Sequence, residues 1–151
     1  MRAARALDTA PPPRATTSRV NPRAPRTVAD LMSDTVIVLQ HDEAIGDSTD
    51  DLDRFRLRHL PVMDGDRVVG VVTHRELVRA LMRRQPGDPA PLAAEVMSTD
   101  VVTAAPDTTV TDALVLLLTR KTGCLLVIDA KGLAGIVTEY DCLKLARSLL
   151  P

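Results

Sequence analysis

Short apolar runs separated by polar turns dominate most of this chain, and they predict strands. The runs at 60–63 and 68–72 are joined by Asp64-Gly65-Asp66, which predicts a hairpin turn. A second pair of runs, at 125–128 and 133–137, predicts another hairpin. These runs are apolar at consecutive positions, which is typical of strands in a sheet that helices cover.

Longer stretches of the chain predict helices. Residues 110–120 have the pattern of an apolar helix, and residues 74–84 and 139–149 predict a closing helix after each hairpin. Two short β-branched runs, at 35–39 and 101–105, predict a first strand in each half of the chain. The predicted order in each half is therefore strand, helix, strand, strand, helix, which indicates a mixed α/β (α+β) fold.

A polar turn separates each predicted first strand from the helix that follows it. Asp42 and Asp107 lie in these turns and are the expected N-caps, because a carboxylate accepts hydrogen bonds from the free N–H groups of a first helical turn. In the first half, residues 47–53 are rich in Asp, Ser and Thr, which have low helix propensity. We therefore expect the first helix to be more polar and less buried than the one at 110–120.

An internal repeat with a constant offset organises the chain. Met32-Ser33 recurs as Met97-Ser98, 65 residues later, and Gly70 recurs as Gly135 at the same offset. One copy of under about 60 residues would bury too little surface to be stable alone, so we expect two copies to pack sheet against sheet. The repeat divides the chain into four parts: a tail at 1–26, a first domain at 27–84, a linker at 85–91 and a second domain at 92–151.

Composition limits the partners that the chain can have. Hydrophobic residues make up 45% and charged residues 26%, with a net charge of −1, so nothing attracts the whole chain to nucleic acid or to a membrane. No apolar run is long enough to span a membrane, and aromatic residues, at 1%, are too few to stack with single-stranded nucleic acid. The tail at 1–26 is rich in Pro, Ala, Thr and Arg and is expected to be disordered, with an arm that contacts an anionic partner as the alternative.

The cysteines and histidines indicate neither disulfides nor a metal site. Cys124 and Cys142 are the only cysteines, which favours a reducing cytoplasm as the location and buried packing as their role. These two residues and His41, His59 and His74 show no spacing typical of metal ligands, so we expect no metal. No nucleophile is accompanied by a base and an orienting acid, and we do not expect an enzyme.

Two segments of the chain resemble a known family. Residues 58–65, Arg-His-Leu-Pro-Val-Met-Asp-Gly, and residues 135–141, Gly-Ile-Val-Thr-Glu-Tyr-Asp, closely resemble the cystathionine-β-synthase-type (CBS) domain, and the likeness covers both repeats. The resemblance implies a Bateman module, which is a pseudo-twofold pair of CBS domains that forms a homodimer. It also implies that AMP, ADP, ATP or S-adenosylmethionine binds between the repeats as a regulatory ligand, with no cofactor required.

The second repeat is expected to hold the sugar and part of the phosphate. Asp141 can accept hydrogen bonds from both ribose hydroxyls, which resembles the role that the family gives this residue. Thr138 precedes the last helix, so its hydroxyl and the free N–H groups of the helix can face a phosphate. Gly135, which has no side chain, is expected to let a ligand approach the backbone closely. The alternative is that Thr138 and Asp141 only cap the helix.

The first repeat is expected to complete the same site, as the resemblance implies. Thr35 and Val36 would line the adenine, and Arg58 and His59 would neutralise the phosphates. The planar guanidinium of Arg58 suits phosphate oxygens, and protonation of His59 would increase affinity as the pH falls. The alternative is that Arg58 and His59 are solvated surface residues.

A second cleft related by the repeat departs from this pattern. Thr73, Glu76 and Val101 would line it, with Glu76 in place of the aspartate. Gly123-Cys124 replaces the basic pair, which would leave a phosphate uncompensated. We therefore expect this weaker cleft to be empty or to bind a less charged ligand.

These observations lead to one functional expectation and one alternative. We expect a stand-alone regulatory module that senses an adenine nucleotide and acts on a separate protein partner, with no membrane or nucleic-acid partner. The alternative is a ligand-free module for dimerisation or protein interaction. The polar residues at 47–53 favour the alternative somewhat, since a remodelled helix could remodel the cleft.

Overall fold

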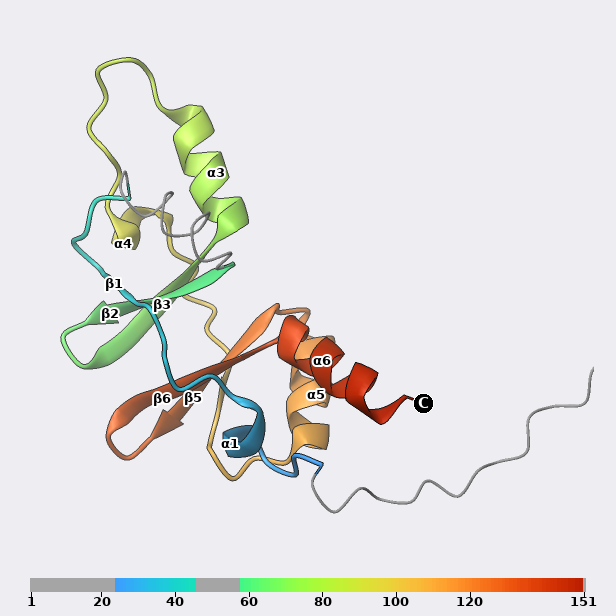
Figure 1. The fold of residues 1–151 in the computed structure, drawn as a ribbon. Coiled ribbons are helices and arrows are strands. Elements are labelled where there is room, and N and C mark those ends of the chain that lie inside the picture. Colours follow the sequence, from blue (N-terminus) through green and yellow to red (C-terminus); the bar gives the residue numbers. More distant parts are fainter. Residues whose placement is uncertain (1–23, 46–57, 151) are drawn as a thin grey trace, which may run out of the picture.

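The computed structural model describes residues 24–45 and 58–150, in which each repeat forms one three-stranded sheet with flanking helices (Figure 1). The elements of the first repeat are α1 (Val28–Leu31), β1 (Leu39–Gln40), β2 (His59–Asp64), β3 (Arg67–Thr73) and α3 (His74–Arg83). Those of the second are α4 (Ala93–Val96), β4 (Thr103–Ala104), α5 (Val110–Arg120), β5 (Cys124–Asp129), β6 (Gly132–Thr138) and α6 (Glu139–Leu149). The predicted helix near residues 47–53 and most of the predicted tail lie outside the described residues.

The two sheets have the same topology. β1 pairs in parallel with β2, where Leu39 lies opposite Val62, and β2 is antiparallel to β3. β4, β5 and β6 repeat this arrangement in the second half of the chain. The hairpin register is also the same, because Val62 lies opposite Gly70, Val127 lies opposite Gly135, and a register shift follows each valine. The predicted α+β fold with two similar repeats is confirmed.

The longer helices follow the sequence pattern, but one predicted cap is wrong. α5 and α6 span the predicted ranges, and α3 ends at Arg83, one residue earlier than predicted. The N-cap of α5 is Thr109, whose hydroxyl accepts the Asp112 N–H at 3.1 Å. Asp107 lies in the preceding turn, so the helix begins two residues later than an Asp107 cap would require. Asp42 also lies in a turn, and the helix predicted after it is outside the described part of the chain.

The first strand of each repeat is much shorter than predicted. Instead of residues 35–39 and 101–105, only the two-residue strands β1 and β4 pair within their own sheets. The reason is that the segment ahead of each strand pairs first with the other repeat. Ser33 and Ile136 exchange both backbone hydrogen bonds, at 2.9 and 3.0 Å, and the second repeat does the same at the equivalent positions. Each segment therefore pairs with its own sheet over only two residues, Leu39–Gln40 in the first repeat and Thr103–Ala104 in the second.

The first short helix of each repeat packs into the core of the other repeat. Val28 of α1 is fully buried in the core of the second repeat, in a cluster with Ala113 and Leu117 of α5. Ala93 of α4 is fully buried in the core of the first repeat, in a cluster with Leu60 of β2. Figure 1 shows α1 against the second half and α4 against the first. The sequence pattern missed both helices because four residues are too few to show a helical period.

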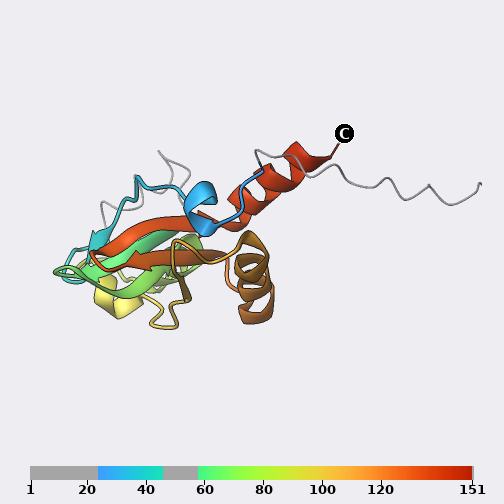
Figure 2. The same ribbon diagram turned by 90° about the horizontal axis from the view of Figure 1, so that it is seen from below.

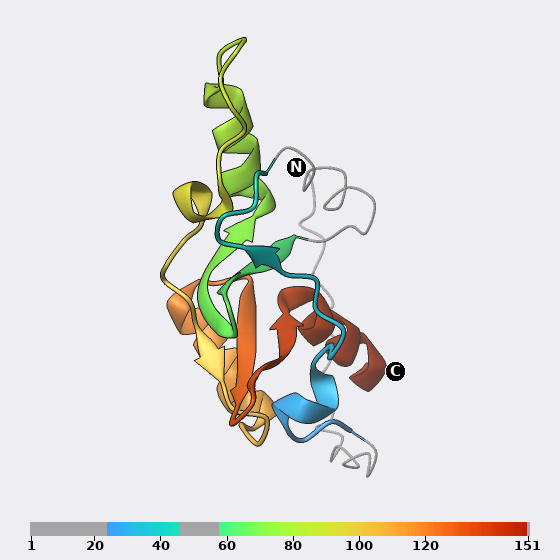
Figure 3. The ribbon, with the colours of Figure 1, turned by 90° about the vertical axis from the view of Figure 1, so that its left-hand side faces the viewer.

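The two sheets pack against each other through a third apolar cluster. It joins Val71 of β3 with Cys124 and Leu126 of β5 and with Ile136 of β6. This contact confirms the predicted packing of sheet against sheet. α6 extends away from the sheets (Figure 2), and α3 rises from the first repeat, away from α6 (Figure 3). None of the helices in 24–45 and 58–150 is long and apolar enough to cross a membrane.

We predict that Gly135→Ala destabilises the protein by about 1–3 kcal/mol, the usual cost of overpacking. A Cβ at Gly135 would lie 2.7 Å from Sδ of Met32 and 2.7 Å from the carbonyl oxygen of Ser33, and a backbone oxygen cannot move away easily. Urea unfolding of the variant measures the loss.

The matched control is Gly70→Ala at the equivalent position of the first repeat. The nearest atoms that its Cβ would meet all belong to the flexible side chain of Met97, so this variant should lose less stability. Equal losses in the two variants would contradict the importance of the Ser33 backbone contact.

Candidate functional site

Thr138 and Asp141 form a capping box at the start of α6. One carboxylate oxygen of Asp141, Oδ2, accepts the Thr138 backbone N–H at 2.9 Å and the Thr138 hydroxyl at 2.8 Å. The predicted alternative, helix capping, is therefore present in the structure. Asp141 is only 6% exposed and is the one buried charged residue of the described part of the chain. Capping uses only Oδ2, so the other carboxylate oxygen, Oδ1, can contact a different group.

Lys144 forms an ion pair with that second oxygen. Its ammonium lies 2.8 Å from Oδ1 of Asp141 and 5.1 Å from the centre of the Tyr140 ring. Burial alone would raise the pKa of Asp141, but the hydrogen bonds from Lys144 and Thr138 outweigh it and hold this pKa below its ordinary value. The hydrogen bond to Asp141 in turn raises the pKa of Lys144. Asp141 is therefore ionised and held in place from two sides.

A cleft of about 280 Å³ lies in front of this carboxylate, close to the lower end of the range for small-molecule sites. It brings together all six residues predicted for the composite site: Thr35, Val36, Arg58, His59, Thr138 and Asp141. The remaining lining residues are Ser33, Ile37, Gly123, Ile136, Glu139, Tyr140 and Lys144. We call this space the Asp141 cleft. Both repeats contribute to it, because the segment that leaves Ser33 crosses in front of β6 before it joins β1.

Sequence reasoning missed two residues of this cleft that carry chemistry. Lys144 follows Asp141 by three positions, a spacing that places two side chains on one face of a helix, so the ion pair could have been found. Tyr140 is the only tyrosine of the chain, and its ring lies next to the same ammonium. Lys144 adds a cation to a site for which the sequence predicted only Arg58 and His59.

The Gly135 prediction was wrong about what approaches the glycine. The space beside its Cα is filled by the Met32 side chain and the Ser33 backbone, not left open for a ligand. The requirement for glycine comes from contact between the two repeats.

His59 lies in a wall between the Asp141 cleft and a second cleft. Arg58, His59, Gly123 and Glu139 line both of them. A Cβ at Gly123 would lie 2.5 Å from Nε2 of His59, so the imidazole fits here only because residue 123 lacks a side chain. Burial lowers the pKa of His59, and Arg58 acts in the same direction, while Glu139 and Glu76 oppose it.

The second cleft, of about 1060 Å³, contains the three residues predicted for it. These are Thr73, Glu76 and Val101, and Glu76 caps α3 by accepting the Thr73 backbone N–H at 2.8 Å. The argument that this cleft lacks cations is wrong, because residues outside the repeated motif supply them. The Lys and Arg residues of its lining are Arg58, Arg75, Arg79, Arg120 and Lys121. That this cleft binds nothing, or only a less charged ligand, stays a prediction.

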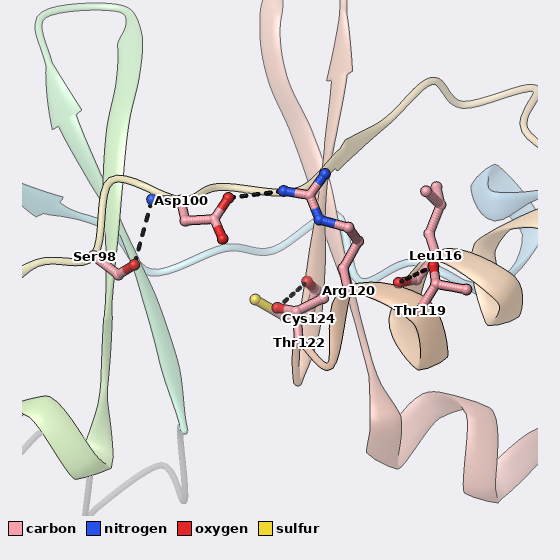
Figure 4. Close-up of polar contacts among 7 residues, drawn as sticks. All are labelled: Ser98, Asp100, Leu116, Thr119, Arg120, Thr122 and Cys124. Carbon is pink, nitrogen blue, oxygen red and sulfur yellow. Dashed lines mark hydrogen bonds and ion pairs between the residues drawn. The ribbon is translucent and has the colours of Figure 1, made fainter.

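Part of this positive charge is already compensated. Arg120 and Asp100 both line the second cleft, and Arg120 donates to Oδ1 of Asp100 at 2.8 Å (Figure 4). Both side chains are well exposed, so the pair is expected to stabilise the protein by less than about 1 kcal/mol. A ligand could therefore exchange this contact easily.

The cysteines fit the packing role predicted for them. Cys124 is buried, and burial together with Glu139 and Glu76 raises the pKa of its thiol to about 12, so it stays protonated. Burial also raises the pKa of Cys142. In 24–45 and 58–150, no three His, Cys, Asp or Glu side chains lie together as metal ligands would.

Comparisons with known proteins identify both repeats. A family model of the CBS domain matches residues 28–83 and 93–148. The A-adding tRNA nucleotidyltransferase of Geobacter sulfurreducens is 33% identical over 119 residues, which are 79% of this chain and 13% of that protein. The inosine-5′-monophosphate dehydrogenase of Methanocaldococcus jannaschii is 30% identical over 124 residues, which are 81% of this chain and 24% of that protein. The chain thus spans less than a quarter of these two relatives.

Solved structures show the same fold. AcuB of Vibrio cholerae superposes with a TM-score of 0.72 at 28% identity, covering 82% of this chain and 91% of that one. CBSX2, solved in complex with AMP, superposes with a TM-score of 0.70 at 26% identity, covering 82% and 97%. The cytosolic domain of the Mg²⁺ channel MgtE, solved with ATP, has a TM-score of 0.66 at 26% identity and covers 79% and 48%.

We predict that acid destabilises the protein in part through His59. Because the folded-state pKa lies below the ordinary value of 6.5, the unfolded chain takes up a proton that the folded protein does not. Stability that is present above pH 6.5 is therefore lost as the pH falls from 6.5 toward the folded-state pKa. Urea unfolding at several pH values should show a shallower loss for His59→Gln than for the wild type.

His74→Gln, at an exposed position of α3, is the matched control for removing one histidine. An NMR titration that places the pKa of His59 at or above 6.5 would contradict this account.

Proposed function

Because this chain belongs to the CBS-domain family, we propose that it is a regulatory module that binds an adenine nucleotide or S-adenosylmethionine between its two repeats. One observation carries the proposal: six residues from the two repeats line a single cleft, and they include a buried carboxylate and two basic residues. A site of this kind suits a ligand that has both hydroxyl groups and negative charge.

Each part of the ligand has residues that suit it. Asp141 would accept hydrogen bonds from the ribose, and Thr138 would lie near the first phosphate at the N-terminal end of α6. Thr35 and Val36 would line the adenine, because they lie on the segment that crosses between the repeats. Arg58 would neutralise phosphate charge, aided by His59 when protonated.

Two similar proteins support a nucleotide as the ligand. CBSX2 was solved with AMP, and the cytosolic domain of MgtE was solved with ATP; each is 26% identical to this chain. The presence of a cleft between the repeats of this chain agrees with such a ligand. These two relatives bind different nucleotides, so they do not select one nucleotide for this chain.

We propose a regulatory mechanism in which the ligand binds and no reaction is catalysed. The ligand would contact Thr35 and Arg58 of one repeat and Asp141 of the other, and would thereby favour conformations in which the repeats are close together. Such a ligand shifts the equilibrium with a separate protein partner only as far as its affinities for the two conformations differ. The cytoplasm is the proposed location, and we propose no catalytic role for the pair.

A second candidate function, interaction without a ligand, has its own observation. α5 is apolar on two sides: Val110, Ala113 and Leu117 are buried, while Leu118 is 76% exposed and Val115 is 51% exposed. A helix that is apolar all round is usually covered on both sides. We propose that a second copy of the chain covers the exposed side, so that the chain forms a homodimer without requiring a ligand.

We predict that Asp141→Ala abolishes the binding of AMP and ATP, because the ribose loses its hydrogen-bond acceptor. Calorimetric titration of AMP, ATP and S-adenosylmethionine measures binding directly. In thermal unfolding, a ligand present at about 100 times its Kd should add about 2.7 kcal/mol of stability to the wild type only.

Asp112→Ala is the matched control for this variant. Asp112 is the third residue of α5 and contacts the N-cap Thr109 as Asp141 contacts Thr138, but it does not line either cleft. Each variant should lose about 0.5–2 kcal/mol of stability through its cap, and only Asp141→Ala should lose binding. If the wild type binds none of the three ligands, the nucleotide proposal is rejected and the ligand-free module is favoured.

We predict that Leu118→Glu shifts the chain from dimer to monomer, because a carboxylate in an apolar interface must be desolvated. Light scattering after size exclusion measures the mass. Thr119→Glu is the control on the same helix, where the residue is also exposed but polar. A monomeric wild type would contradict the proposed dimer.

A further inference from the structure

The Lys144 ammonium stands where a ribose would have to bind. It contacts Oδ1 of Asp141 at 2.8 Å, and this is the only ion pair of Lys144 within 24–45 and 58–150. The Asp141 side chain is 9% exposed and the Lys144 side chain is 58% exposed. The cation therefore covers the carboxylate from the side that a ligand would approach.

The acceptor capacity of Asp141 shows what must move. An ionised carboxylate has about four lone-pair positions, two on each oxygen. Both positions of Oδ2 are used by the Thr138 N–H and the Thr138 hydroxyl, and one position of Oδ1 is used by Lys144. One position remains, whereas a ribose diol brings two hydroxyl donors. Both hydroxyls can bind only if Lys144 gives up its place.

Lys144 is able to move, and a suitable anion would draw it to a new position. Its long side chain is mostly in solvent, and the contact that it loses is replaceable by any nearby anion. The cleft also contains Arg58 and His59, so phosphate bound there would meet a second and a third basic side chain. Against these stand two acidic groups of the lining, Asp141 and Glu139. The charged side chains Arg58 and Lys144 are thus balanced by two carboxylates, but a ribose bound to Asp141 leaves the Lys144 ammonium without its ion-pair partner.

We propose that Lys144 is a specificity-determining residue that makes the Asp141 cleft select phosphorylated adenosines over uncharged or cationic adenosine ligands. A phosphate replaces the carboxylate that Lys144 loses, so AMP exchanges one ion pair for another. Adenosine displaces the ammonium and offers no anion in return, and S-adenosylmethionine brings a sulfonium cation, which repels the displaced ammonium. This inference rests on the proposed function, and it narrows the ligand class of the same site.

The test compares AMP with adenosine in calorimetric titrations of the full chain. Lys144→Met keeps the apolar part of the side chain and removes the charge. In this variant AMP should bind more weakly relative to adenosine. The Kd of adenosine divided by the Kd of AMP should fall about five- to tenfold, which is the effect of one charge-assisted contact. Adenosine should bind as well as, or better than, it binds the wild type. S-adenosylmethionine should likewise gain affinity.

Two controls separate selection from a structural effect. Lys144→Arg retains the charge and should retain the preference for AMP. Lys131→Met removes a lysine from the turn between β5 and β6, outside both clefts, and should leave the ratio unchanged. A change of both Kd values by the same factor in Lys144→Met would overturn the inference, since a merely structural role would weaken both ligands alike.

Failure of this inference can be told apart from failure of the proposed function. If AMP binds the wild type and the ratio is unchanged in Lys144→Met, only the role of Lys144 is rejected. If none of AMP, ATP, adenosine and S-adenosylmethionine binds the wild type, both proposals are rejected. If S-adenosylmethionine binds the wild type more tightly than AMP does, the ligand class proposed here is wrong although the site is right.

Discussion

The exchange of leading segments between the two repeats is the contact on which the rest of the structure depends. Each segment makes two backbone hydrogen bonds to the last strand of the other repeat, which is an edge strand of its sheet, at Ser33 with Ile136 and at Ser98 with Val71. Each also buries a short helix in the other core, with Val28 or Ala93 fully covered. Since neither sheet has a complete cover of its own, the two repeats stabilise each other and form one folding unit.

The exchange also creates the candidate site. After Ser33, the chain has to travel back to its own sheet, and on the way Thr35 and Val36 pass in front of Asp141. The cleft is therefore lined by both repeats because of how the chain is connected. Sequence differences then make the two clefts unequal, since Arg58-His59 lie where Gly123-Cys124 stand in the other repeat, and the imidazole occupies the space that glycine leaves.

Asp141 illustrates how a structural role and a functional role can share one side chain. One oxygen caps α6, which fixes the carboxylate in position, and hydrogen bonds from Lys144 and Thr138 lower its pKa despite burial. The other oxygen is paired with the exposed ammonium of Lys144, which under our proposal a ligand displaces. Helix capping and ribose binding are therefore compatible interpretations, because they use different oxygens. Under the same proposal, charge separates one adenosine ligand from another more than the shape of the cavity does.

The sequence by itself determined the elements that local pattern controls. The repeat offset, both hairpins and the exact span of α5 and α6 follow from apolar runs and turn residues that act over a few positions. The motif residues also predicted which six side chains would meet in one cleft. Only the tertiary structure decided the short first strands, the exchanged helices α1 and α4, the contact that requires Gly135, and the additional cations of the second cleft. These features depend on contacts between residues that are far apart in the chain, and no pattern in a local window of sequence records which distant segment a residue will meet.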